Sequence, residues 1–128
     1  MSQFLAGLGL WKGYVKKGYS TSLEMPEPAR SDCHGWGAHP LYHLATQVAG
    51  VCPQGAFFGR VKIAPQPGPF KWLRCGVPHA KGMIEVDLRF DDGKCRGTVT
   101  LPEGLDGVFD WRGETIELKG GKTVEIGG

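Results

Sequence analysis

The sequence lacks any apolar run of the roughly 18 residues that a membrane-spanning helix needs. Its start, MSQFLAGLGL, has neither the charged segment nor the small-residue cleavage site of an export signal. An excess of charge is also missing, because 15 basic and 13 acidic residues give a formal net charge of +2. These absences predict a soluble chain without an export signal, cytoplasmic or periplasmic, that binds neither nucleic acid nor a membrane.

The sequence also lacks paired cysteines. Its four cysteines stand far apart and none forms a C-x-x-C pair, which argues against zinc knuckles and thioredoxin-type chemistry. With 41% apolar residues the chain can bury a core without disulfides, so we expect free, buried thiols. His39 and His43 stand four apart, but Pro40 is expected to place His39 at the N-cap, outside the regular helix. We therefore expect no metal ion and no other cofactor.

Glycine, by contrast, is abundant: 21 of 128 residues predict many tight turns. Residues 4–19 nevertheless have helical spacing of their apolar side chains, although glycines within this stretch cost about 1 kcal/mol each relative to alanine. A helix this weak needs a partner surface. The predicted apolar face consists of Phe4, Leu5, Leu8, Trp11 and Val15.

A second, shorter helix is predicted from Pro40, which suits the first turn of a helix, to Gly50, which is a typical stop. Its apolar stripe consists of Leu41, Leu44, Ala45 and Val48. Between the two helices, residues 20–37 show no period and contain several prolines, so they read as a long ordered loop. Loops of this length in compact domains are usually functional or disordered.

From Arg60 onward the hydrophobic period changes to two, which is typical of half-buried strands. The clearest run is residues 84–90, where apolar and charged side chains alternate. Turn signals separate the runs at Asp91-Asp92-Gly93, Pro102-Glu103-Gly104, Arg112-Gly113 and Gly120-Gly121. The predicted fold class is mostly β: a C-terminal antiparallel β-sandwich of about seven strands over residues 57–127, preceded by two helices.

The loop between the helices is dense in groups that bind polar ligands. A glycosidase needs two carboxylates across the scissile bond and an aromatic face for the sugar ring. Glu24 or Glu27, together with Trp36, could supply half of such a site. The alternative interpretation is that Glu27 and Asp32 are solvated, that Arg30 pairs with one of them, and that Trp36 belongs to the core.

The run Arg30–Pro40, RSDCHGWGAHP, resembles a motif of bacterial α-L-rhamnosidases of glycoside hydrolase family 78. Two flanking segments support the resemblance: Ser20–Glu24 is similar to the family's T-T-x-x-E segment, and Val61–Gly68 to its V-x-I-x-P-x-x-G strand. The resemblance covers nearly the whole chain and thins after about residue 100. Gly37 stands where serine is frequent in the family.

This resemblance implies a large multidomain enzyme in which an (α/α)6 catalytic barrel precedes a C-terminal β-sandwich. Residues 1–52 would then be the terminal helices and active-site loop of the barrel, and residues 53–128 the sandwich. The two predicted helices would be the part of that barrel that this chain contains. The family cleaves terminal α-L-rhamnosyl linkages with inversion, using one carboxylic acid and one carboxylate that activates water.

By motif position, Glu24 resembles the general base, His34 the residue that hydrogen-bonds the rhamnose, and Trp36 a wall of the sugar pocket. The family's general acid lies upstream of the segments present here. We therefore expect the C-terminal fragment of an inverting glycoside hydrolase that is inactive alone. Its expected partners are a rhamnosylated glycan or glycoside and, through the N-terminal helix, a second copy.

Two alternatives belong to other functional classes. The sandwich could be a non-catalytic carbohydrate-binding module that presents Phe70, Trp72 and Trp111, which exposed tryptophans would favour. It could instead be a structural cap on the barrel, which is our preferred interpretation of residues 57–127. We expect Trp72 and Trp111 in the sandwich core, because each lies in an alternating or apolar strand run.

Overall fold

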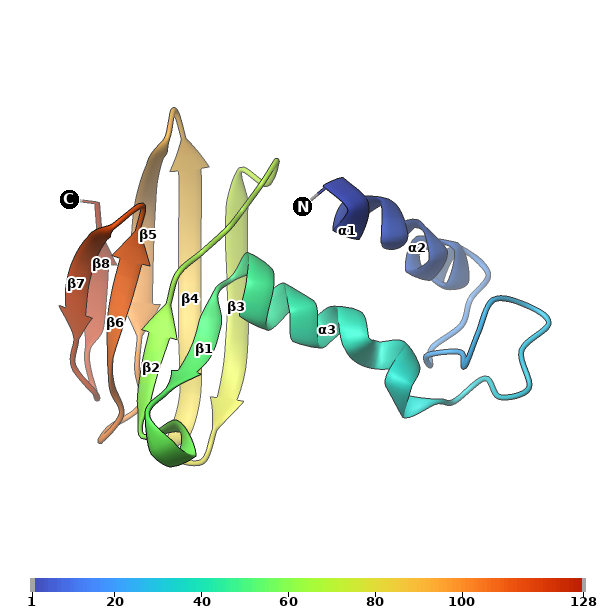
Figure 1. Cartoon of the computed structure of the whole chain (residues 1–128), viewed down its shortest axis with the longest axis horizontal. Coiled ribbons are helices and arrows are strands. Elements are labelled where there is room, and N and C mark those ends of the chain that lie inside the picture. The colour runs from blue at the N-terminus through green and yellow to red at the C-terminus, as the bar shows by residue number, and fades with distance from the viewer. Residues whose placement is uncertain (1, 128) are drawn as a thin grey trace. The chain divides into compact units, whose positions relative to one another are not determined.

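The computed structural model describes residues 2–127 of the chain (Figure 1). The backbone forms two compact units, one ending at His43 and the other starting at Leu44. We call them the N-terminal unit and the C-terminal unit. The sequence analysis places the end of the barrel segment at residue 52, a position that lies within strand β1, Val51–Gln54.

The N-terminal unit begins with two short helices, α1 (Ser2–Gly7) and α2 (Gly9–Lys16), in place of the single helix predicted over residues 4–19. The predicted apolar face is wrong at one end, because Val15 is 73% exposed and Tyr14 is only 6% exposed. Tyr14 is buried because its hydroxyl donates a hydrogen bond to the carbonyl of Met25, 3.1 Å away. A tertiary contact therefore decides which side of α2 turns inward.

A 3₁₀ turn, η1 (Gly35–Ala38), leads directly into α3 (His39–His43). His39 has helical backbone angles, φ −53° and ψ −25°, so the expectation that it lies outside the helix is wrong. The preceding turn supplies the start of the helix, and Pro40 is tolerated in its first turn. Leu41, predicted in the apolar stripe, is 71% exposed. Among residues 2–127, no three His, Cys, Asp or Glu side chains lie together as a metal site requires.

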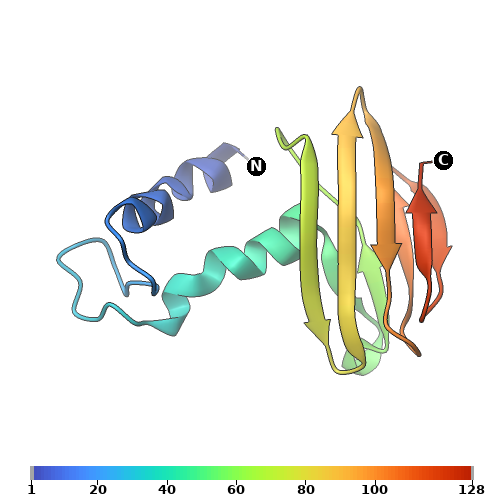
Figure 2. The ribbon, with the colours of Figure 1, turned by 180° about the vertical axis from the view of Figure 1, so that it is seen from behind.

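The C-terminal unit opens with a π-helical turn, η2 (Leu44–Val48), and is otherwise built from strands and a short 3₁₀ turn, η3 (Ala56–Phe58). One sheet has the order β1-β2-β6-β7 and the other β3-β4-β5-β8 (Figures 1 and 2). The remaining strands are β2 (Arg60–Ile63), β3 (Trp72–His79), β4 (Gly82–Asp91), β5 (Lys94–Thr100), β6 (Asp106–Trp111), β7 (Glu114–Leu118) and β8 (Thr123–Ile126).

The expectation of a purely antiparallel sandwich is confirmed for one sheet and wrong for the other. β2 and β6 pair in parallel, with Val61 opposite Gly107 and Ile63 opposite Phe109. Parallel neighbours need a crossover, and here the chain from β2 to β6 passes through three strands of the other sheet. Hydrophobic alternation shows which face of a strand is buried but carries no information about the direction of its neighbour.

The alternating run of β4 is buried as predicted, with Ile84, Val86 and Leu88 at most 1% exposed. The predicted turns are also present: Asp92 and Gly93, and likewise Arg112 and Gly113, have positive φ values. These values suit the two-residue hairpins that join β4 to β5 and β6 to β7. A further glycine, Gly50, has a φ of +72°, and a Cβ on it would lie 2.1 Å from the carbonyl oxygen of Ala64. Only glycine fits where the chain turns into β1.

All four cysteines are free, as expected, but only Cys95 is buried. Burial raises the pKa of the Cys95 thiol to about 11, whereas Cys33 is exposed. The expectation of buried thiols is therefore wrong for Cys33. Within residues 2–127, no helix has the length and apolar character to cross a membrane.

Candidate functional site

The loop of the N-terminal unit is folded back on itself by main-chain hydrogen bonds. The amide of Glu24 donates to the carbonyl of Ser31 at 3.0 Å, and the amide of His34 donates to the carbonyl of Ser22 at 2.8 Å. Leu23 lies between these contacts and is only 2% exposed. The residues predicted to carry chemistry are thereby held in an ordered arrangement, although they belong to no regular helix or strand.

Glu24 is bound by Arg30. Nε of Arg30 donates to Oε2 of Glu24 at 3.2 Å, and the second guanidinium nitrogen donates to Oε1. The Glu24 side chain is 4% exposed, whereas that of Arg30 is 76% exposed. The alternative interpretation paired Arg30 with Glu27 or Asp32, and this is wrong. Both oxygens of the predicted general base accept hydrogen bonds from a cation that faces solvent.

The other glutamate of the loop has different partners. Glu27 accepts a 2.7 Å hydrogen bond from the Tyr19 hydroxyl and forms an ion pair with Lys17. Its side chain is 36% exposed. Glu27 therefore anchors the loop to the residues that follow α2, and Glu24 is the carboxylate that accompanies the aromatic side chains described next.

Trp36 and His34 form a small aromatic surface beside Glu24. Their ring centroids are 4.1 Å apart with a tilt of 43°. The Trp36 indole N–H donates to the carbonyl of Glu24 at 3.0 Å, and the side chain is 62% exposed. The structure thus brings together Glu24, His34 and Trp36, the three residues singled out from the sequence. It excludes Trp36 from the core.

Trp11 and Gly37, whose contacts with the loop the sequence did not predict, hold this arrangement in place. The Trp11 indole N–H donates to the carbonyl of Gly37 at 2.7 Å. Gly37 is buried, and a Cβ at this position would lie 2.3 Å from the carbonyl oxygen of Leu23. Gly37 therefore contacts α2 through its carbonyl, and it lies too close to Leu23 to carry a side chain. The signal in the sequence was this glycine, at a position where serine is frequent in the resembled family.

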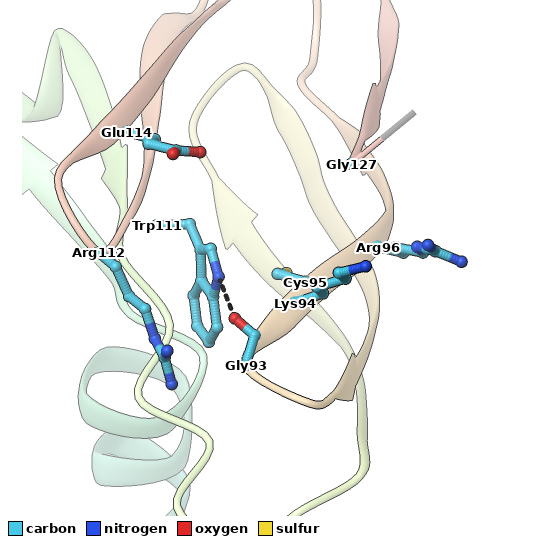
Figure 3. Close-up of a pocket in the computed structure, with 8 residues that line it drawn as sticks. All are labelled: Gly93, Lys94, Cys95, Arg96, Trp111, Arg112, Glu114 and Gly127. Atoms are coloured by element: carbon cyan, nitrogen blue, oxygen red, sulfur yellow. Dashed lines mark hydrogen bonds between the residues drawn. The ribbon is translucent and has the colours of Figure 1, made fainter.

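The C-terminal unit has a cavity of about 420 Å³ at the hairpin ends of β4–β5 and β6–β7 (Figure 3). Its lining includes Lys94, Arg96, Arg112, Glu114 and Trp111. The Trp111 indole N–H donates to the carbonyl of Gly93 at 3.2 Å. Figure 3 shows Arg112 on one side of this indole, and Lys94 and Arg96 on the other. The cations therefore do not converge on one ligand position.

The chain is similar to solved structures of two α-L-rhamnosidases. Over 90% of its length, the chain superposes on 16% of the α-L-rhamnosidase from Dictyoglumus thermophilum, with a TM-score of 0.61 and 16% identity. Over 77% of its length, it superposes on 11% of the Streptomyces avermitilis α-L-rhamnosidase complexed with L-rhamnose, with a TM-score of 0.61 and 19% identity. No family model and no curated protein matches the sequence.

These likenesses show the fold. The resemblance to bacterial α-L-rhamnosidases, first indicated by the loop motif, is confirmed as a structural match over most of the chain. The chain spans less than a fifth of the length of either enzyme. A shared fold at this identity leaves the chemistry of the chain to be argued from its own residues.

Proposed function

We propose that this chain corresponds to the C-terminal part of an inverting glycoside hydrolase that acts on terminal α-L-rhamnosyl linkages. In this proposal residues 1–52 contribute terminal barrel helices and an active-site loop, and residues 53–128 are the C-terminal sandwich. Glu24 is the general base, and His34 and Trp36 bind the sugar. The observation that carries the proposal is the exposed Trp36 indole, which contacts the His34 ring and donates a hydrogen bond to the main-chain carbonyl of Glu24.

Each of these groups suits one part of a deoxyhexose. The face of the Trp36 indole can pack against the apolar face of a pyranose ring. The His34 ring can donate or accept a hydrogen bond to a sugar hydroxyl. A carboxylate close to both could orient a water molecule toward the anomeric carbon. The arrangement matches half of a glycosidase site.

The same geometry argues against turnover by the chain alone. An inverting enzyme needs a second carboxyl group about 6.5–9.5 Å from the base, on the opposite side of the bond. Glu27 is engaged by Tyr19 and Lys17, and both oxygens of Glu24 are engaged by Arg30. We therefore propose that the chain binds L-rhamnose weakly and does not hydrolyse rhamnosides.

The test is a titration of the purified chain with L-rhamnose, read from the indole N–H signals of its four tryptophans by NMR. We expect a saturable shift of the Trp36 signal in the unmodified chain, and we expect binding of L-rhamnose measured by calorimetry to be lost in Trp36→Ala. Trp72→Ala is the matched control, because Trp72 is 64% exposed and Trp36 is 62% exposed. Absence of any rhamnose-induced shift in the unmodified chain, or equal rhamnose binding in both variants, would contradict the proposed half-site.

A hydrolysis assay on a chromogenic α-L-rhamnoside tests the second half of the proposal. We expect no turnover above that of the Glu24→Gln variant. Release of the chromophore by the unmodified chain, with loss in Glu24→Gln, would show a complete active site and contradict the inactive-fragment assignment.

The exposed apolar side chains of the N-terminal unit support a further part of the proposal, self-association through its helices. Leu10 is 37% exposed and Val15 is 73% exposed, both on α2. Exposed apolar side chains on a short, glycine-rich helix favour association with another surface. Sedimentation should show concentration-dependent association that weakens in Val15→Ser. A monomer at all concentrations would remove this part of the proposal.

A second candidate, a non-catalytic carbohydrate-binding module, is favoured by one observation in the C-terminal unit. Trp72, expected in the sandwich core, is 64% exposed on β3. The third candidate, a structural cap, needs no exposed aromatic ring on the sandwich, so the exposure of Trp72 does not favour it.

A further inference from the structure

The solvent-facing side of the sheet β3-β4-β5-β8 has one row in which an aromatic ring stands next to two arginines. Trp72 of β3 lies opposite Arg89 of β4, and Arg89 lies opposite Arg96 of β5. Directly opposite residues in antiparallel strands place their side chains on the same face, about 5 Å apart. All three residues are exposed, and the three strands lie side by side in Figure 2. We call them the Trp72 row.

An indole in this position is unusual for the face that carries it. The alternate residues of β4 on the same face, Glu85, Asp87 and Arg89, are charged, and its inward residues form the core. Among the described residues of this sheet, only Trp72 and Met83 are large apolar side chains with high exposure. Trp72 contributes nothing to the core and leaves a flat apolar surface in water.

The two arginines add a local electrostatic cost. Like charges directly opposite each other in a sheet are destabilising. Within residues 2–127, neither Arg89 nor Arg96 forms an ion pair, whereas Arg74 on the next row is paired with Asp87 at 3.7 Å. A hollow of about 300 Å³ adjoins the two arginines, and Lys94, Asp91 and Asp92 also line it. An anion bound across the row would remove the repulsion.

We propose that the Trp72 row binds an acidic saccharide, a chain of pyranose rings that carry carboxylates. One ring packs its apolar face on the Trp72 indole, and a carboxylate of that ring or of its neighbour accepts paired hydrogen bonds from Arg89 and Arg96. A guanidinium group matches the two oxygens of a carboxylate in geometry as well as in charge. This inference is independent of the proposed rhamnosyl hydrolysis, because it uses none of the residues around Glu24.

Charge complementarity and the indole together select this ligand class. A small inorganic anion would be held by the arginines and would gain nothing from Trp72. A neutral saccharide would stack on Trp72 and would gain nothing from the arginine pair. A saccharide with carboxylates uses all three side chains of the row.

The experiment is a calorimetric titration of the whole chain with an oligogalacturonate, compared with the same oligosaccharide after reduction of its carboxylates to neutral hydroxymethyl groups. Inorganic phosphate is titrated in a separate arm. We expect measurable binding of the oligogalacturonate that weakens as salt is added, because salt screens exposed charges. We expect binding of the neutral oligosaccharide and of phosphate to be at least about tenfold weaker, the loss of one charged hydrogen-bond pair.

Variants then assign the site. Trp72→Ala, Arg89→Ala and Arg96→Ala should each weaken oligogalacturonate binding by about tenfold, since each removes an interaction worth at least 1.4 kcal/mol. Lys122→Ala is the control for loss of one positive charge outside the row, and Phe57→Ala is the control for loss of an exposed aromatic ring. Both controls should bind like the unmodified chain. All of the substituted side chains are exposed, so circular dichroism should show an unchanged fold.

Three results would overturn the inference: no binding of the oligogalacturonate, equal binding of its neutral counterpart, or equal weakening in Lys122→Ala and Arg89→Ala. Rhamnose binding at Trp36 can fail while this site stands, and the reverse also holds. The Trp36 and Trp72 variants therefore separate failure of this inference from failure of the proposed function.

Discussion

The two units of this chain are stabilised in different ways. In the C-terminal unit a continuous apolar core lies between two sheets, with Val61, Ile84 and Leu88 completely inaccessible to solvent. In the N-terminal unit only Tyr14, Leu23 and Pro40 of the described residues are buried apolar side chains. Its loop is held by main-chain hydrogen bonds and by hydrogen bonds from side chains to distant carbonyls, such as Trp11 to Gly37 and Trp36 to Glu24.

The difference gives a physical reason why the proposed site residues lie in the N-terminal unit. A buried core gives several kcal/mol of stability and leaves few polar groups free, whereas a loop held by hydrogen bonds keeps polar groups at the surface. Regions that bind ligands are often taken from the less stable part of a structure. The sandwich can therefore fold on its own residues, and the loop with Glu24 gains most from a partner or ligand.

The distribution of tryptophans allows both units to be followed in one experiment. Trp11 and Trp36 belong to the N-terminal unit, and Trp72 and Trp111 to the C-terminal unit. Incorporation of fluorotryptophan would give a separate fluorine NMR signal for each. A urea titration then reports the unfolding of each unit, and the predictions below are stated for these two pairs of signals.

The largest effect is expected for Phe109→Ala, which removes a core side chain that is 1% exposed. Truncation of a buried phenylalanine usually costs about 3–5 kcal/mol of unfolding free energy. The unfolding free energy read from the Trp72 and Trp111 signals should fall by that amount and their urea midpoint should fall with it, while the Trp11 and Trp36 signals keep their midpoint. Phe57→Ala is the control, because Phe57 is fully exposed, at 103%. Equal losses in both pairs of signals would show that the units unfold together.

A smaller loss of stability, this time in the N-terminal unit, is expected for Gly37→Ala. The added Cβ would lie 2.3 Å from the carbonyl oxygen of Leu23, so Gly37 and the segment at Leu23 must move apart, which disturbs the Gly37 carbonyl that the Trp11 indole binds. Overpacking of this kind costs about 1–3 kcal/mol. The Trp11 and Trp36 signals should unfold at lower urea and rhamnose binding should weaken, while the Trp72 and Trp111 signals are unchanged.

Gly35→Ala is the matched control for this substitution. Gly35 belongs to the same 3₁₀ turn, and a Cβ on it would meet nothing within 4 Å. We expect its urea midpoints to match those of the unmodified chain. If Gly35→Ala and Gly37→Ala have equal effects, the contact with Leu23 is not what positions the loop.

Much of the C-terminal unit could be predicted from sequence because its local signals agree with its tertiary structure. The alternation at residues 84–90 and the turns at Asp92-Gly93 and Arg112-Gly113 each specify a face or a reversal by short-range chemistry. The parallel pairing of β2 with β6 joins residues 46 positions apart, such as Val61 and Gly107, so no local pattern contains it. Trp72 was misassigned because alternation predicts two faces and does not say which one an isolated indole takes.

The contact among the candidate residues was predictable in part, and their partners were not. The sequence singled out Glu24, His34 and Trp36, and the structure links them through the Trp36 indole. That Arg30 binds both oxygens of Glu24 depends on the reversal of the loop between Glu24 and Ser31, which the sequence does not specify. Tyr14 and Trp11 were read as parts of a helix, and their hydrogen bonds to the loop required knowledge of its path. The roles of the three site residues stay predictions.

The smallest expected effect is a dependence of the stability of the C-terminal unit on pH. The Lys119 side chain hydrogen-bonds Asp106, with the Gly120 amide as a further donor, and lowers the pKa of that carboxyl. The Lys62 side chain, followed by the Gly113 amide, likewise lowers the pKa of Asp110. Both carboxyls are on β6.

A carboxyl whose pKa is lower in the folded than in the unfolded chain stabilises the fold above its unfolded pKa, about 3.9 for aspartate, and loses this contribution as pH falls through the folded value. The urea midpoint of Trp72 and Trp111 should therefore be insensitive to these two groups from pH 7 to about 5 and should fall below about pH 4. Asp106→Asn should lower the midpoint slightly at neutral pH and reduce the acid-induced loss, because the asparagine does not titrate. A midpoint that stays constant or rises on acidification would show that the contacts of β6 with Lys62 and Lys119 do not stabilise the sandwich.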